Sequence, residues 1–324
     1  MNYRYFYSLL CLGLSLILAV PMARALDIKP DAKSLSHCIL GAYQEDCGNL
    51  DEAVLEYEKA LKLDPQSSQL HLNLATVLIK KDDASGAEAE LKQAIKLDPQ
   101  ATEPHLILAL VYVAQDKINL AQDEYLAALK NAASLEPKNI EIYQGLGALY
   151  LEQKKFKEAQ EIYKLILALN PKDSQAHFYL GNIYYLLKDF PAVEKELKSA
   201  IKLDPESAEA LNFLGYFYLE QNKSINQAGA LIAQALKLDP ENGAYLDSWG
   251  WFYFKKGKLQ EALVELEKAA HNLTDPVIFE HLGDTYRKLG NLAQAKINWE
   301  KSLALDKTQT KIKEKLLQLT NHGK

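Results

Sequence analysis

Apolar residues along this chain recur at helical spacing, in pairs of short segments separated by a polar turn. Between residues 68 and 103, two apolar stripes flank the polar run 81–86. The first stripe consists of Leu72, Leu74, Ala75, Val77 and Leu78, and the second of Ala87, Leu91, Ala94 and Ile95. Residues three and four apart share one face of an α-helix, so this pattern predicts two helices joined by a turn at 81–86.

A short phrase closes each pair of segments. The sequence Ala-Leu-Lys-Leu-Asp-Pro at 60–65 returns with little change, and its copies follow one another at intervals of 31 to 38 residues. The copies end at Pro65, Pro99, Pro137, Pro171, Pro205, Pro240, Pro276 and, without a proline, Lys307. Proline has no amide donor and disfavours the α region in the residue before it, so it ends the second helix. A period in this range predicts stacked helical hairpins rather than one globular core.

The hairpins also share residue types at fixed positions. The sixth hairpin carries Leu211, Leu214, Gly215, Tyr218, Ala228, Ile232, Ala235 and Pro240, and the eighth carries Phe279, Leu282, Gly283, Tyr286, Ala295, Trp299 and Ser302. This pattern resembles the signature of the tetratricopeptide repeat (TPR). The resemblance implies an all-α fold, a right-handed α-solenoid of about eight hairpins over residues 34–307. The small residue, Gly215 in the sixth hairpin, would let its two helices approach closely.

Both ends of the chain depart from the repeat. Residues 1–25 contain Arg4, the apolar run 9–20 and Ala-Arg-Ala at 23–25, which is the pattern of a cleaved secretory signal peptide. An uncleaved membrane anchor is the alternative, because the run approaches the length of a bilayer span. Residues 26–33 are a short linker. Residues 308–324 carry Ile312, Leu316, Leu317 and Leu319 among lysines, which predicts an amphipathic capping helix.

Charge argues against a nucleic-acid partner. The formal net charge is −6, and removal of residues 1–25 makes it more negative, whereas nucleic-acid affinity comes mainly from neutralised phosphates. We therefore expect an exported chain, periplasmic or secreted, with no membrane insertion after cleavage. Cys38 and Cys47 would then lie in an oxidising compartment. On one unbroken helix they would be about 13 Å apart. A disulfide therefore requires the helix to unwind, and two free thiols are the alternative.

Four histidines hold the same repeat position: His37, His71, His105 and His177. Equivalent positions in successive hairpins lie roughly 10 Å apart, too far to bind one zinc ion. We therefore interpret these histidines as packing residues and expect no metal and no cofactor. The sequence contains no nucleophile elbow, phosphate loop or zinc-protease motif. We expect no catalytic residue.

The TPR resemblance implies a concave groove lined by the first helix of each hairpin. Residues next to the packing positions on these helices would face this groove. The candidate partner-binding residues are Phe178, Asn182, Tyr185, Asn212, Tyr216, Asp247, Trp251, Phe254, Asp284 and Arg287. Amide side chains for a peptide backbone and rings for apolar side chains make a plausible peptide track. The alternative is that closure of the superhelix or the capping helix buries these rings. We expect Trp251→Ala and Tyr216→Ala to weaken partner capture with little change in thermal stability.

The sequence therefore predicts a non-catalytic scaffold in the cell envelope that binds an extended peptide or a helix of a protein partner. One alternative is a membrane-anchored structural subunit of an envelope assembly or export machine. Another is an accessory repeat subunit of a glycan-processing complex. The sequence does not indicate the partner or the oligomeric state.

Overall fold

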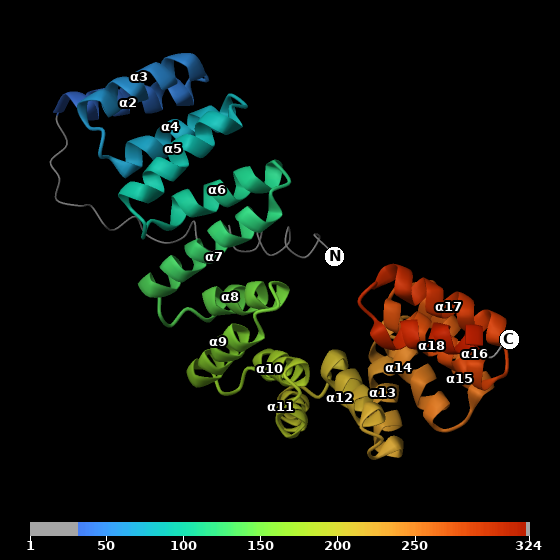
Figure 1. Cartoon of the computed structure of the whole chain (residues 1–324). Helices are drawn as coiled ribbons and strands as arrows, with labels where there is room; N and C mark the ends of the chain where they lie inside the picture. Colours follow the sequence, from blue (N-terminus) through green and yellow to red (C-terminus); the bar gives the residue numbers. More distant parts are fainter. Residues whose placement is uncertain (1–31, 322–324) are drawn as a thin grey trace. The chain divides into compact units, whose positions relative to one another are not determined.

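The computed structural model describes residues 32–321. Within this range the chain forms 17 α-helices and no strand, so the expected all-α repeat solenoid is confirmed (Figure 1). The helices α2 to α17 are paired as eight antiparallel hairpins, and α18 follows them. Contacts divide the chain into two compact units, with the boundary between Leu169 and Asn170.

Unit 1 contains four hairpins. They are α2–α3 (Ala32–Asp46 and Leu50–Leu63), α4–α5 (Ser68–Lys80 and Ala84–Leu97), α6–α7 (Thr102–Ala114 and Ile118–Leu135) and α8–α9 (Ile140–Glu152 and Phe156–Leu169). Helix α7 has 18 residues where α5 has 14, which accounts for the longer interval before Pro137. Helices α3 and α5 end at the leucine that precedes Asp-Pro, as the sequence predicts.

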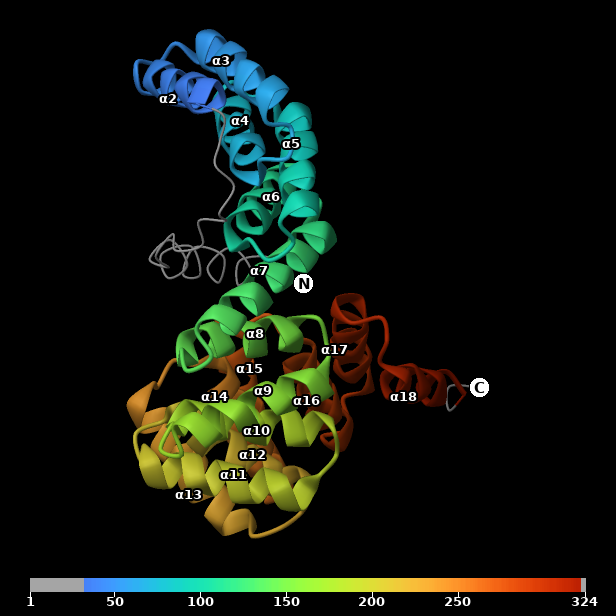
Figure 2. The same cartoon turned by 90° about the vertical axis from the view of Figure 1, so that its left-hand side faces the viewer.

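Unit 2 contains the other four hairpins and the last helix. They are α10–α11 (Ser174–Leu186 and Phe190–Leu203), α12–α13 (Ala208–Glu220 and Ile225–Leu238), α14–α15 (Gly243–Lys255 and Leu259–Asn272), α16–α17 (Pro276–Lys288 and Leu292–Leu305) and α18 (Thr310–Asn321). In Figure 2, α18 follows α17 as a separate helix at the carboxyl end.

The turns within hairpins are shorter than the polar run at 81–86 indicates. Helix α5 already begins at Ala84, because the carboxylate of Asp83 caps it by accepting the Gly86 N–H at 2.9 Å. The turn is therefore only Lys81 to Asp83, and Asp82 adopts the left-handed conformation with φ 63°. Each of the eight hairpin turns contains such a residue, at Gly48, Asp82, Asp116, Lys154, Lys188, Asn222, Gly257 and Gly290, and the turn before α13 contains a second one, Ser224.

The core of each hairpin depends on a small residue in its first helix. A Cβ atom on Gly215 would lie 2.6 Å from Cγ1 of Ile232 and 2.9 Å from the carbonyl oxygen of Ala228. Helices α12 and α13 therefore pack backbone against side chain with no room for a methyl group. The expected close approach at this position is confirmed.

The predicted capping helix is present as α18. Ile312 is fully buried and, with Leu316 and Leu319, packs against Trp299 and Ala295 of α17. Leu317 was expected in the same stripe, but it is 63% exposed, because its position on the helix turns it away from α17.

The four histidines at the same repeat position make equivalent hydrogen bonds, each within its own hairpin. In each case Nδ1 lies 2.6 Å from a carboxylate oxygen of a glutamate 19 residues later, on the second helix of the same hairpin. The pairs are His37 with Glu56, His71 with Glu90, His105 with Glu124, and His177 with Glu196. Each pair therefore links the two helices of one hairpin.

Cys38 and Cys47 are both free thiols in the structure. Cys38 is half-buried within α2, and Cys47 lies exposed in the turn after that helix. Residues 1–31, including the expected signal peptide, lie outside the described residues. Among the helices of residues 32–321, none is both long and apolar enough to cross a bilayer.

Candidate functional site on the first-helix face of unit 2

The first helices of successive hairpins touch one another in unit 2. Helix α12 contacts α14, and α14 contacts α16, whereas α13 and α15 make no comparable contact with each other. The side formed by α10, α12, α14 and α16 is therefore the more closely spaced side of the unit. We call it the first-helix face.

The ten predicted groove residues all belong to this face, but they differ in accessibility. Phe178, Asn182, Tyr185, Asn212, Tyr216, Phe254 and Asp284 are partly exposed, and Arg287 is exposed. Asp247 and Trp251, by contrast, are only 6% and 7% exposed. Neighbouring side chains therefore already cover the Trp251 ring, so we no longer expect its loss to leave stability nearly unchanged.

Trp251 lies at the centre of a buried cluster that joins three hairpins. Its ring stacks on His281 of α16, with centroids 3.9 Å apart and planes 12° apart, and on Phe254, with centroids 4.4 Å apart. Its indole N–H donates a 2.9 Å hydrogen bond to Glu220 at the end of α12. His281 Nδ1 in turn lies 2.9 Å from Oδ1 of Asp247. We call Glu220, Asp247, Trp251, Phe254 and His281 the Trp251 cluster.

Carboxylates give this cluster a negative potential. Burial opposes the charged form of His281, but the carboxylates of Asp247, Glu220 and Glu280 more than offset this, so the pKa of His281 is raised above 6.5. Burial, followed by the same carboxylates, raises the pKa of Tyr216 well above 10. An imidazolium held between Asp247 and the Trp251 ring combines an ion pair with a cation–π contact.

A second group of rings lies on α10 and α12 and remains partly exposed. Phe213 is its centre: its ring lies 5.4 Å from that of Tyr185 and 6.3 Å from that of Phe178, both in edge-to-face geometry. Beside these rings, the side-chain oxygen of Asn212 is buried and has no hydrogen-bond partner among residues 32–321. We call Phe178, Tyr185, Asn212 and Phe213 the ring patch.

The last part of the face is already occupied by the chain itself. Lys315 of α18 lies 2.7 Å from Asp284 and 2.9 Å from Glu280, and its ammonium is 5.6 Å from the Trp299 ring centre. Asp284, predicted to contact a partner, is therefore paired within the protein. Arg287 projects over the same ring, with Cζ 5.9 Å from its centre.

The sequence interpretation missed His281, Phe213 and Lys315. His281 follows Asp247 by 34 residues, one repeat, and this spacing was a detectable signal for contact between neighbouring first helices. Phe213 adjoins a packing position, and its exposure depends on how α10 meets α12. The pairing of Lys315 depends on where α18 docks, which no repeat spacing gives.

Comparisons with known proteins agree with this fold. Profiles of the tetratricopeptide repeat match residues 47–111 and 112–183, residues 194–242 and residues 278–309. No curated protein matches the chain in sequence.

Solved structures resemble it at low identity. A tetratricopeptide repeat protein from Parabacteroides merdae is 20% identical with a TM-score of 0.58, over 78% of this chain and 98% of that one. The APC/C hetero-tetramer Cut9–Hcn1 is 14% identical with a TM-score of 0.56, over 99% of this chain and 76% of that one. With eight hairpins, their shared small residues and these profiles in agreement, the chain belongs to the tetratricopeptide repeat family, whose fold is that of a protein interaction scaffold.

Proposed function

We propose that this protein is a non-catalytic scaffold that acts outside the cytoplasm and binds extended segments of partner proteins on the first-helix face of unit 2. The ring patch is its principal contact surface. The Trp251 cluster holds α12, α14 and α16 in place beneath it and is not itself the contact.

The observation that carries this proposal is the ring patch, whose rings from α10 and α12 lie edge to face and remain partly exposed. The Asn212 amide beside them has a buried oxygen without a hydrogen-bond partner among residues 32–321, and rotation of this amide toward solvent would offer the oxygen to a ligand N–H. Partly exposed rings beside it supply apolar contact area at low cost in side-chain entropy. An extended peptide offers both groups in alternation along its backbone.

The charge of the face favours basic side chains in the partner. After burial, which has the largest effect, the carboxylates of Glu220, Asp247 and Glu280 raise the pKa of Tyr216. Lys315 of α18 illustrates how a cation is accepted here, between Glu280 and Asp284. A partner segment with alternating apolar and basic residues therefore suits the face better than an acidic one.

Two substitutions in the ring patch test the contact surface. Phe178→Ala and Tyr185→Ala remove partly exposed rings, so cross-linked isolation from the native envelope should recover at least 10-fold less partner. Leu238→Ala on α13, where the side chain is 46% exposed, is the matched control and should recover the same amount as the parent. If the ring-patch variants recover as much partner as the parent, the ring patch is not the contact surface.

The export part of the proposal rests on residues 1–25 alone. Amino-terminal sequencing of the exported protein should begin at Leu26. A mature chain that still begins near Met1 would favour the alternative, a membrane-anchored subunit.

A further inference from the structure

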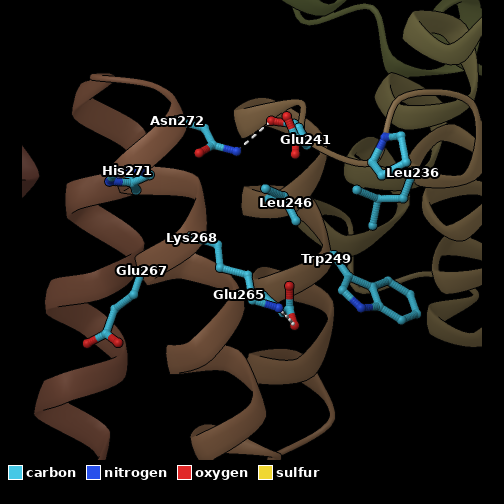
Figure 3. A pocket seen from close by; sticks show the side chains of 10 residues that line it. Leu236, Glu241, Leu246, Trp249, Glu265, Glu267, Lys268, His271 and Asn272 are labelled. Carbon is cyan, nitrogen blue, oxygen red and sulfur yellow. Dashed lines mark hydrogen bonds and ion pairs between the residues drawn. The ribbon is translucent and has the colours of Figure 1, made fainter.

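A second candidate site lies on the other side of α14. A pocket of about 610 Å³ opens between the end of α13 and α15. Leu236, Pro240, Leu246 and Trp249 form its apolar wall, and Glu241 and Glu265 lie at its rim (Figure 3). Trp249 and Trp251 are two residues apart on one helix. Their side chains therefore leave the helix axis in directions about 200° apart. The pocket is therefore distinct from the first-helix face.

Trp249 departs from the repeat in a way that makes this pocket. Its position carries a leucine in all seven other hairpins. Leu40 of the first hairpin is 41% exposed, and the other six are at most 4% exposed: Leu74, Leu108, Leu146, Leu180, Leu214 and Leu282. Trp249 is instead partly exposed. It stacks on Phe252, with ring centroids 4.8 Å apart and planes 17° apart, and meets Tyr253 edge-on at 5.0 Å. The indole is thus held rigidly with one side toward the pocket.

The polar groups around the pocket are mainly acidic. Glu265 pairs with Lys268 at 2.9 Å, as Figure 3 shows, while the carboxylate of Glu241 has no hydrogen-bond or ion-pair partner among residues 32–321. Glu267 adds a third carboxylate, and Lys268 and His271 are the basic side chains that line the pocket. Carboxylates therefore outnumber basic side chains around the pocket, and the net charge beside Trp249 is negative.

We propose that this pocket binds an arginine side chain, flanked by an apolar residue, from a partner protein. A guanidinium stacks on an indole and forms two parallel hydrogen bonds with a carboxylate, so Trp249 and Glu241 together suit it. The apolar neighbour would pack on Leu236 and Leu246. Tryptophan in a partly dry pocket is also the side chain most often found to dominate binding energy.

A peptide titration tests the ligand chemistry. Acetyl-Leu-Arg-Leu-amide is added to the isotope-labelled protein while the indole N–H signals are followed by NMR. The Trp249 signal should shift saturably, with a dissociation constant on the order of 1 mM, and the Trp251 and Trp299 signals should stay in place. Acetyl-Leu-Glu-Leu-amide should have no effect. No shift with the arginine peptide, an equal shift with the glutamate peptide, or a shift confined to Trp251 would overturn the proposal.

Two variants locate the site. Trp249→Leu restores the residue of the seven other hairpins and should fold, and Glu241→Gln changes an exposed loop side chain. Because Trp249 is then absent, binding is followed by backbone amide shifts around Leu246. Affinity should fall at least 10-fold in the first variant and about threefold in the second, while Glu300→Gln on α17 leaves it unchanged. Unchanged affinity in Trp249→Leu would contradict the assignment.

Discussion

The two units repeat the same hairpin but hold it together differently. In unit 1, three hairpins use a His–Glu pair between their own first and second helices. In unit 2, that pair survives only at His177, and the Trp251 cluster instead joins the first helices of three neighbouring hairpins. Neighbouring hairpins of unit 1 are joined by ion pairs such as Lys80 with Glu45 and Lys117 with Glu88, whereas in unit 2 a buried cluster joins the first helices themselves. Hairpins with the same backbone repeat therefore present different side chains on their first helices in the two units.

The difference has an energetic consequence. A part-exposed side-chain hydrogen bond such as the His–Glu pairs contributes about 0.5–1.5 kcal/mol. A buried tryptophan with a hydrogen bond and ring stacking contributes several times more. We expect the hairpins of unit 1 to open more independently of one another than those of unit 2, whose first helices share one buried cluster. A binding face benefits from the second arrangement, because it fixes side chains from different hairpins relative to one another.

The largest expected effect comes from Trp251→Ala. This change removes a buried ring, its stacking on His281 and its hydrogen bond to Glu220, so unit 2 should lose about 3–5 kcal/mol of unfolding free energy. Urea denaturation followed by far-UV circular dichroism measures the loss. Tyr43→Ala, at a 62% exposed ring in unit 1, is the control and should change stability by less than about 0.5 kcal/mol. A loss below about 1 kcal/mol in Trp251→Ala would contradict the role of the cluster.

Gly215→Leu should destabilise somewhat less. Its side chain would meet Ile232 and the Ala228 carbonyl within the sixth hairpin, and overpacking of this kind costs about 1–3 kcal/mol or more. The midpoint of urea unfolding measures it. Gly257→Asn, in a turn with open space around the Cβ position and φ 73°, is the matched glycine control and should be almost neutral. Similar losses in both variants would mean that helix contact is not what Gly215 provides.

A smaller effect is a pH dependence of the stability of unit 2. The pKa of His281 is raised in the folded protein, so protonation favours folding. Its stabilisation is fully present below the unfolded value of about 6.5 and is lost as pH rises through the folded pKa. Urea midpoints of unit 2 should therefore fall as pH rises above about 6.5, and Asp247→Asn should flatten the change. An unchanged slope in that variant would remove Asp247 as the cause.

The smallest effect is expected from the pairs of unit 1. Glu124→Gln keeps a hydrogen-bond acceptor for His105 but removes the charge, and should cost about 0.5–1.5 kcal/mol. Hydrogen exchange should show faster opening of α6 and α7 alone. If the amides of α4 and α8 exchange faster to the same degree, the His105–Glu124 pair stabilises more than its own hairpin.

Much of the fold follows from local sequence, and the site does not. Asp-Pro ends the second helices, and small residues such as Gly215 mark the close helix contacts, because both effects act within one hairpin. The burial of Asp247 and Trp251 was not predictable from register, since it depends on how closely α12, α14 and α16 approach. The start of α5 at Ala84 was also not predicted. It depends on the N-cap Asp83, which lies within the polar run 81–86 that we had interpreted as a turn. The 19-residue His–Glu spacing, by contrast, was present in the sequence and was overlooked.

The central claim is that unit 2, and not unit 1, presents the partner-binding face. A photoreactive amino acid placed at Asn182 of α10 or at the equivalent Ala148 of α8 compares the two faces directly in the native envelope. We predict that Asn182 gives a discrete cross-linked product, that Tyr185→Ala abolishes it, and that Ala148 gives none. An equal product from Ala148, or one from Asn182 that persists with Tyr185→Ala, would contradict the claim.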